Sequence, residues 1–302
     1  MSAVEEIEQA VRHVHETAAA AIVGIGRGPR GCGVVVAPNR VLTSAHNLRD
    51  RTTSVTFGDG RDVQASATGV DLDGDLAVLE VDTGDVVPLV WGDPDEVVPG
   101  RLVYAAARSR SGLRTTVGLV TATEQDLRGP RGRRITGSIE HTAPLPRGSS
   151  GGPVLDREGR LLGLNTRRLG EGFYSALPAD EALRARVEAL AAGEAPSRRR
   201  LGLVLAPTAV ARRLRAAVGL PERDGLLVRA VEEESPAAGA GIREGDLLVE
   251  AGGRPLTDAD VLHEVLDALA DGATLELLVV RGADELRVGV TFPDAPAPPS
   301  ST

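Results

Sequence analysis

The chain has 302 residues, of which 42% are hydrophobic and 25% charged, a composition typical of a globular protein with one or two domains. All 34 basic residues are arginine and 43 residues are acidic, so the formal net charge is -9. These values exclude a wholly disordered or collagen-like chain and give no general attraction to nucleic acid or anionic lipid. The single cysteine, Cys32, excludes an intramolecular disulfide.

Neither a membrane span nor a secretory signal is visible. No apolar run approaches the roughly 20 residues that cross a bilayer. The acidic pair Glu5-Glu6 stands where a secretory signal would be basic. The chain as given therefore predicts a soluble cytoplasmic protein, whereas a longer form could be exported or membrane-anchored.

The first half of the chain predicts one helix followed by many short strands. Apolar residues at spacings of three and four predict an amphipathic helix within residues 1–20. From residue 21 onward, short runs rich in Val, Leu and Thr alternate with Gly, Pro and Asp, which favours an antiparallel barrel or sandwich. A helix over 181–192 closes this domain, predicted to span 21–192.

The second half begins with a polar linker over 193–200. Residues 201–292 then mix strands with two helical patterns, 208–218 and 258–269, the latter starting near Thr257. The Pro/Ala/Ser-rich residues 293–302 predict a disordered tail.

A serine within a glycine-rich turn is the first chemical signal. In Gly148-Ser149-Ser150-Gly151-Gly152-Pro153 the small residues allow a sharp turn that exposes backbone N–H groups. The N–H groups of Gly148 and Ser150, with Ser149 between them, could hold the oxyanion of a tetrahedral intermediate. By itself the segment is equally consistent with a structural turn.

A candidate base and a candidate carboxylate precede this serine. His46 follows the apolar run Val41-Leu42, and imidazole is the group that activates a serine hydroxyl. Asp75 leads directly into the apolar run 76–79, where it could orient and stabilise the imidazole. The order His46, Asp75, Ser150 is that of chymotrypsin-like enzymes. No metal-ligand spacing is present, so neither a metal nor another cofactor is expected.

With these residues in view, the chain resembles the HtrA family of trypsin-like serine proteases. The resemblance rests on Thr43-Ser44-Ala45-His46, Asp75-Leu76-Ala77-Val78-Leu79, residues 148–153 and Gly163-Leu164-Asn165-Thr166. It implies two six-stranded antiparallel β-barrels of the chymotrypsin type followed by an α+β PDZ domain, a mainly β fold. Two departures concern the site: Ser149 stands where the family usually has Asn, and Asn47 follows the histidine where an apolar residue is usual.

The resemblance also assigns a specificity pocket to Pro144, Leu145, Leu164 and Asn165. Because neither Pro144 nor Leu145 is acidic, a preference for small or medium aliphatic side chains is expected before the scissile bond.

Residues 201–292 resemble a PDZ domain through Ser235-Pro236-Ala237-Ala238-Gly239 and Glu244-Gly245-Asp246. Leu201-Gly202-Leu203-Val204 is similar to the loop that binds a peptide's terminal carboxylate. The helical stripe Leu262, Val265 and Leu266 is expected to contribute to the peptide groove, although core packing is the simpler expectation for each residue.

Two functions follow from these signals. The first is a serine endopeptidase acting on unfolded or misfolded proteins, with a PDZ domain that binds peptide C-termini. The alternative is a weakly active or inactive peptide-binding, chaperone-like module of the same fold. The resemblance also implies a possible homotrimer, although residues 1–56 contain no aromatic residue to hold it.

Overall fold

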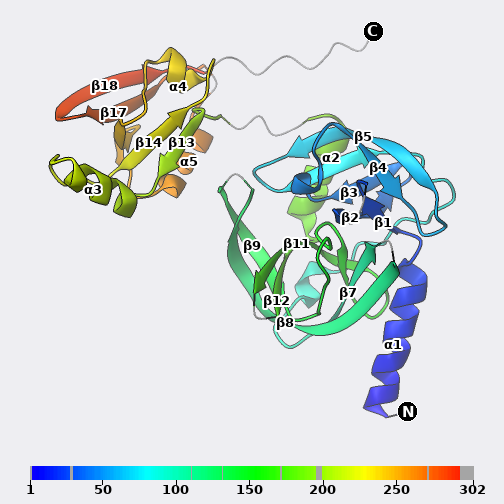
Figure 1. The fold of residues 1–302 in the computed structure, drawn as a ribbon. Coiled ribbons are helices and arrows are strands. Elements are labelled where there is room, and N and C mark those ends of the chain that lie inside the picture. Colours follow the sequence, from blue (N-terminus) through cyan, green and yellow to red (C-terminus); the bar gives the residue numbers. More distant parts are fainter. Residues whose placement is uncertain are drawn as a thin grey trace, which may run out of the picture. The chain divides into compact units, whose positions relative to one another are not determined.

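A computed structural model of the protein describes residues 2–27, 30–109, 111–130, 132–170, 172–194, 199–270 and 272–292. The chain forms two units, residues 1–196 and residues 197–302 (Figure 1). The predicted tail, 293–302, and residues 195–198 of the predicted linker lie outside the described residues. Among the helices that the structure describes, none combines the length and apolar character needed to cross a membrane.

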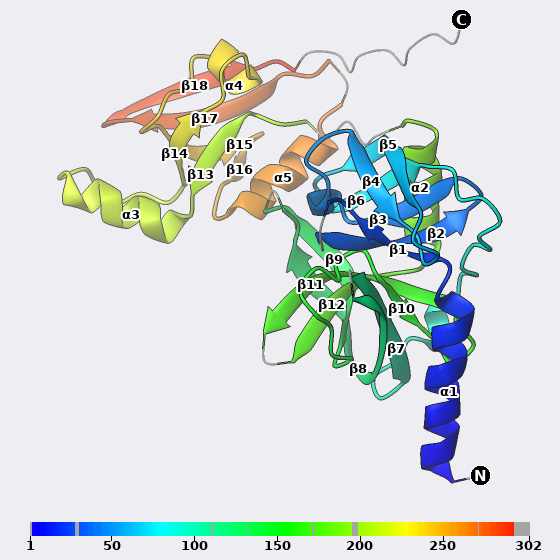
Figure 2. The ribbon, with the colours of Figure 1, turned by 45° about the vertical axis from the view of Figure 1, so that its right-hand side comes forward.

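The N-terminal helix α1 (Ala3–Ala18) begins at a capping box. The Ser2 hydroxyl accepts a hydrogen bond from the Glu5 N–H, and the Glu5 carboxylate accepts one from the Ser2 N–H. Val14 and Ala18 are buried, whereas Val4 is 65% exposed. Figures 1 and 2 show α1 projecting from the barrels, with its C-terminal end leading into the first strand.

The first barrel closes in the order β1-β2-β3-β6-β5-β4. Its strands are β1 (Ile22–Ile25), β2 (Gly31–Ala37), β3 (Arg40–Thr43), β4 (Thr52–Thr56), β5 (Asp62–Asp71) and β6 (Leu76–Glu80). A short 3₁₀ helix, η1 (Ala45–Asn47), follows β3, and a second, η2 (Pro94–Glu96), lies between the barrels in sequence.

The second barrel closes in the order β10-β11-β12-β9-β8-β7. Its strands are β7 (Leu102–Ser109), β8 (Gly112–Arg128), β9 (Arg134–His141), β10 (Pro153–Leu155), β11 (Leu161–Gly170) and β12 (Phe173–Pro178). The expected pair of six-stranded antiparallel barrels is therefore confirmed. Helix α2 (Glu181–Ala191) follows and buries Leu183, Val187 and Leu190.

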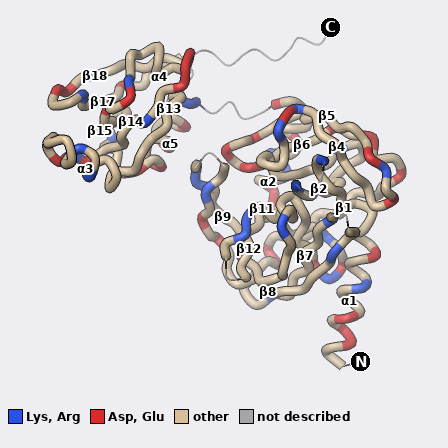
Figure 3. The backbone as a smooth tube through the Cα atoms, viewed as in Figure 1, with Lys and Arg blue, Asp and Glu red and all other residues tan. Residues whose placement is uncertain are grey.

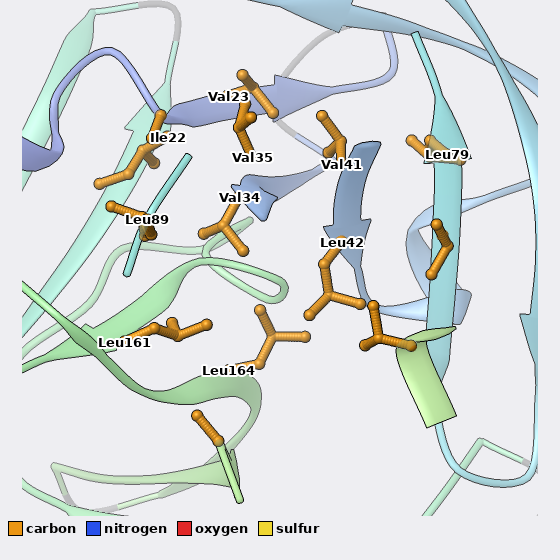
Figure 4. Close-up of a cluster of buried hydrophobic side chains, with 14 of the residues drawn as sticks. Ile22, Val23, Val34, Val35, Val41, Leu42, Leu79, Leu89, Leu161 and Leu164 are labelled. Atoms are coloured by element: carbon orange, nitrogen blue, oxygen red, sulfur yellow. The ribbon is translucent and has the colours of Figure 1, made fainter. Parts of the chain in front are cut away.

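One apolar cluster joins the two barrels (Figure 4). Val34 and Leu42 of the first barrel belong to the same buried cluster as Leu161 and Leu164 of β11. With 2% aromatic residues in the chain, aliphatic side chains supply most of this core. This shared core packs the two barrels against each other.

The second unit is built on an antiparallel sheet with the strand order β13-β14-β15-β17-β18, in which β16 also pairs with β15. Its elements are β13 (Leu203–Ala206), α3 (Thr208–Ala217), β14 (Leu226–Val231), α4 (Pro236–Gly239), β15 (Leu247–Ala251), β16 (Arg254–Pro255), α5 (Ala259–Ala268), β17 (Leu275–Arg281) and β18 (Asp284–Val290). Acidic residues and arginines are interspersed along both units (Figure 3).

Helix α5 begins one residue later than the sequence pattern placed it. Its N-cap is Asp258, whose carboxylate accepts hydrogen bonds from the N–H groups of Asp260 and Val261. The expectation of a start at Thr257 was therefore wrong by one position. Aspartate accepts from N2 and N3 at least as well as threonine does, so two neighbouring cap formers are not distinguished by sequence.

Candidate active site

His46 and Asp75 form a close pair within the first barrel. His46 lies in η1, and its Nδ1 is 2.9 and 2.8 Å from the two carboxylate oxygens of Asp75. The His46 backbone N–H also donates to Asp75 Oδ1 at 3.1 Å. Because a carboxylate only accepts, Nδ1 carries the proton and neutral His46 keeps Nε2 as a proton acceptor. The Asp75 side chain is 5% exposed and that of His46 38%, so the carboxylate is shielded while the imidazole reaches solvent.

The loop between β5 and β6 fixes the position of Asp75. Asp75 itself has φ 53°, a left-handed conformation that is unusual for a residue other than glycine. Four residues before Asp75, Asp71 accepts a hydrogen bond from the Gly74 N–H at 2.8 Å. Arg186 of α2 binds the other Asp71 oxygen at 2.8 Å and the Gly74 carbonyl at 3.3 Å. A Cβ at Gly74 would lie 1.8 Å from the Arg186 guanidinium, so this contact requires glycine.

Ser150 lies in the turn before β10. Gly148 and Gly151 on either side of it have φ values of 81° and 82°, which suit glycine. The Ser150 hydroxyl donates to the Thr166 carbonyl at 2.8 Å. Within the described residues it makes no hydrogen bond to His46. The structure thus brings the histidine and aspartate into contact, whereas the serine hydroxyl is turned to another acceptor.

In the turn around Ser150, the carbonyls have hydrogen-bond partners, whereas three N–H groups have none in the described part of the chain. The Ser150 carbonyl accepts from the Cys32 N–H at 2.8 Å, and the Gly148 carbonyl accepts from the Cys32 thiol at 3.4 Å. Among the described residues, no acceptor is present for the N–H groups of Gly148, Ser149 and Ser150. An oxyanion hole consists of such backbone donors without internal partners.

The four residues expected to form a specificity pocket lie in different environments. Pro144 is exposed. Leu145 and Leu164 are buried in apolar clusters, and Asn165 is 3% exposed. The Asn165 amide donates to the carbonyls of Gly152 and Pro153, so it ties β11 to the serine turn. Pro144 is the only one of the four that presents its side chain to solvent, and the pocket itself stays a prediction.

His141 has a structural position beneath this turn. Its Nε2 is 2.8 Å from the Asn165 side-chain oxygen, and the ring stacks on Tyr174. Burial lowers the pKa of His141, with the Asn165 hydrogen bond opposing that shift. The buried ring is connected to the serine turn through Asn165, whose amide donates to the carbonyls of Gly152 and Pro153.

Cys32 is a buried thiol next to the serine turn. It is 0% exposed, and burial raises its pKa to about 11 from 9.0. Its Sγ lies 3.2 Å from the Arg108 N–H and 3.4 Å from the Gly148 carbonyl. Burial holds the thiol in its neutral form, whereas the Arg108 N–H and the charge of Arg108 oppose this rise in pKa.

We expect native Cys32 to resist alkylation at pH 8 and to react once the chain is unfolded in urea, because the thiolate is the nucleophile. Since the folded pKa lies above the unfolded one, the stability from this thiol is full below about pH 9 and is lost as pH rises through about 11. Mass spectrometry of iodoacetamide-treated protein measures the first effect. Rapid native labelling would contradict the burial.

Two functional contacts could not be found from the sequence. Arg186 reaches Asp71 across 115 positions, and Asn47 donates to the Ser150 carbonyl across 103. Asn47 did carry one signal, because a polar residue stands there in place of an apolar one. Arg186 is one of two arginines in α2 and one of 34 in the chain, and it carried no such signal.

In the second unit, the segment similar to a carboxylate-binding loop, Leu201-Gly202-Leu203-Val204, runs into the edge strand β13 (Leu203–Ala206). The N–H groups of Leu201 and Gly202 have no acceptor among the described residues, and their carbonyls accept from Ala237 and Glu232. Leu203 is half-buried, whereas Val204 is 54% exposed. The α5 stripe belongs to the core of this unit: Leu262, Val265 and Leu266.

Comparison with known proteins finds a matching domain family for each of the two units. Residues 31–164 match the trypsin-like peptidase domain family, and residues 213–292 match the PDZ domain family. The chain is 30% identical over 275 residues to a probable periplasmic serine endoprotease DegP-like of Halomonas elongata, covering 88% of this chain and 56% of the relative. It is 27% identical over 273 residues to serine protease HTRA1 of Xenopus tropicalis, covering 86% and 57%. The chain thus spans about half the length of these relatives.

Solved structures show the same fold. The HtrA-type protease AlgW with a decapeptide superposes with a TM-score of 0.66 at 21% identity, covering 95% of this chain and 99% of that one. A serine endoprotease from Yersinia pestis gives 0.62 at 24% identity, covering 95% and 98%.

The fold and the domain matches define a trypsin-like peptidase domain followed by a PDZ domain. Both domains are present in this order in the aligned part of the chain, which is similar to relatives named DegP-like serine endoprotease and serine protease HTRA1 and has the fold of HtrA-type proteases.

Proposed function

We propose that this chain is a serine endopeptidase that hydrolyses peptide bonds of unfolded or misfolded proteins. The observation that carries the proposal is the short contact of His46 Nδ1 with both oxygens of the shielded Asp75 carboxylate. The peptidase domain is assigned to 21–192 and the PDZ domain to 201–292, joined by the linker 193–200. Relatives named serine endoproteases match across both domains, which supports the same reaction type.

In the proposed reaction, the Ser150 hydroxyl rotates from the Thr166 carbonyl toward His46 Nε2. That nitrogen takes the hydroxyl proton as Oγ bonds to the scissile carbonyl carbon, and Asp75 stabilises the imidazolium. The N–H groups of Gly148 and Ser150 stabilise the negative oxygen of the tetrahedral intermediate. His46 then gives its proton to the departing amine, and a water molecule repeats the cycle to release the acid and regenerate Ser150.

A fluorophosphonate probe tests this directly. Native protein is expected to be labelled at Ser150, and Ser150→Ala to take up no label, with kcat falling about 10⁶-fold. Heat-unfolded wild type is the control, because labelling requires the assembled site. Label in Ser150→Ala, or on another serine, would refute the assignment.

One observation favours the alternative of a non-hydrolytic peptide-binding module: the Ser150 hydroxyl faces the Thr166 carbonyl. This alternative function predicts that an unfolded substrate protein stays soluble and intact in the presence of either wild type or Ser150→Ala. Loss of intact substrate protein with wild type alone separates the two functions.

The PDZ domain is proposed to bind the C-terminus of a peptide that adds to the edge strand β13. The N–H groups of Leu201 and Gly202, which have no acceptor among the described residues, suit the terminal carboxylate, and the exposed Val204 suits an apolar side chain. AlgW, which shares the fold, was solved with a decapeptide.

We expect an apolar peptide with a free C-terminus to bind at least about tenfold more tightly than its C-terminal amide, because hydrogen bonds to a charged group contribute about 1.5–3 kcal/mol. Fluorescence polarisation with the full chain measures both peptides. Equal affinity would place the peptide elsewhere.

A homotrimer is proposed from resemblance alone, with the aliphatic face of α1 as its contact. Val4 on that face is 65% exposed. Light scattering of the purified chain gives the oligomeric state.

A further inference from the structure

The side chain of Asn47 is buried between the histidine segment and the serine turn. Asn47 is the last residue of η1, directly after His46, and is 2% exposed. Its Nδ2 donates to the Ser150 carbonyl at 2.9 Å and to the Thr43 hydroxyl oxygen at 3.0 Å. The Cys32 carbonyl lies at 3.5 Å from the same nitrogen. One amide nitrogen therefore faces three oxygens from three segments.

The orientation of this amide follows from its neighbours. The Thr43 hydroxyl donates its own proton to the Cys32 carbonyl at 2.6 Å, so toward Asn47 it can only accept. The amide nitrogen must then face this group. Asn47 Oδ1 is left buried without a hydrogen-bond partner in the described part of the chain. An unpaired buried oxygen is costly, so the donor side of the amide must be valuable at this position.

Two glycines make room for the amide. A Cβ at Gly31 would lie 2.1 Å from Asn47 Cγ, and a Cβ at Gly151 would lie 3.1 Å from Nδ2 and 2.1 Å from the Cys32 carbonyl. Gly31 starts β2 and Gly151 directly follows Ser150. Gly31 in the first barrel and Gly151 in the serine turn thus leave the space that the Asn47 side chain occupies.

The Ser150 carbonyl receives two hydrogen bonds, one from Nδ2 and one from the Cys32 N–H at 2.8 Å. Both donors belong to the first barrel, whereas Ser150 precedes β10 of the second. The backbone of Ser150 is therefore attached to the barrel that carries His46.

We propose that Asn47 is a positioning residue for the reaction assigned to this site. Its amide holds the backbone of Ser150 from the position next to His46. It thereby sets the distance that the Ser150 hydroxyl must cover to reach His46 Nε2. The inference rests on the proposed function. It adds a role for a residue that touches neither substrate nor the reacting atoms.

Two variants test the role. Asn47→Leu keeps similar volume without the donor, and Asn47→Asp keeps the shape but replaces the donor by an acceptor. Because a misplacement near 1 Å costs about 10²-fold in rate, kcat on an unstructured fluorogenic peptide is expected to fall by roughly that factor. KM should stay within about threefold, since Asn47 does not contact the substrate.

Thr43→Val is the matched control. It removes two buried hydrogen bonds in the same cluster but leaves the bond from Asn47 to Ser150 in place. Its melting temperature should fall as in Asn47→Leu, while kcat stays within about threefold of wild type. Wild-type kcat in a folded Asn47→Leu or Asn47→Asp, or an equal loss in Thr43→Val, would overturn the inference.

Hydrogen exchange supplies a readout independent of catalysis. The peptide containing residues 147–152 is expected to exchange roughly tenfold faster in Asn47→Asp than in wild type or Thr43→Val, because the turn opens more readily. Unchanged exchange overturns the positioning role. Faster exchange in a chain whose wild type takes up no fluorophosphonate would support the contact and refute only the proposed function.

Discussion

Asp75→Asn is expected to lower kcat for peptide hydrolysis by about 10⁴-fold, the cost of removing the equivalent carboxylate from a serine protease. The Asp75 oxygens accept from His46 Nδ1 at 2.9 and 2.8 Å. An amide at this position can present its NH₂ group to Nδ1, which favours the tautomer with the proton on Nε2. That tautomer cannot take the proton of Ser150.

Asp73→Asn is the matched control for this loss. Asp73 lies in the same loop, is 8% exposed and pairs with Arg133 at 3.7 Å. It makes no contact with His46 in the described structure. Steady-state kinetics on one peptide substrate should show Asp73→Asn within about fivefold of wild type. Equal losses in the two variants would mean that the loop, and not the Asp75 carboxylate, determines the rate.

The sequence distinguished Asp75 from its neighbours because local pattern carries that information. Asp71, Asp73 and Asp75 are equally acidic, but only Asp75 leads directly into a buried strand. The structure places Asp75 against His46 and turns Asp71 toward Arg186. Short-range periodicity likewise predicted a helix over 181–192, where the structure has α2 (Glu181–Ala191), and one within 1–20, where it has α1 (Ala3–Ala18).

Barrel closure and cross-barrel contacts have no such local signature. Strand runs alone left a barrel and a sandwich equally open, because period-two alternation says nothing about which strands pair. The pairing of β1 with β4 to close the first barrel was available only through family resemblance. The contact of Asn47 with Ser150 depends on that closure, so the residue type alone could mark it as unusual and nothing more.

The α5 stripe shows a second limit. Leu262, Val265 and Leu266 have the spacing of one helix face, which suits a groove and a core equally. The structure buries all three in the core of the second unit. Residue spacing determines which side chains share one face of a helix. Whether a ligand can reach that face depends on what the face packs against in the folded structure.

Arg186→Leu is expected to destabilise the barrel unit by about 3 kcal/mol, because it removes the Arg186 guanidinium from the buried Asp71 carboxylate. Asp71 is 3% exposed, and the Arg186 side chain is 31% exposed. For a unit of about this size the loss corresponds to a fall in melting temperature of roughly 6–12 °C. Calorimetry is the suitable measurement, since two units in one chain can unfold in separate transitions.

A second substitution separates the ion pair from other effects of Arg186. Asp71→Asn combined with Arg186→Leu should be more stable than Arg186→Leu alone, because an amide is far less costly to bury than a carboxylate. Arg49→Leu replaces an exposed arginine of the same unit that forms no ion pair with any residue that the structure describes, and should change stability by less than about 0.5 kcal/mol. If the double variant melts no higher than Arg186→Leu, the Asp71 charge is not what Arg186 stabilises. In that case α2 would stabilise the loop before Asp75 through the hydrogen bond from Arg186 to the Gly74 carbonyl and through its buried side chains, Leu183, Val187 and Leu190.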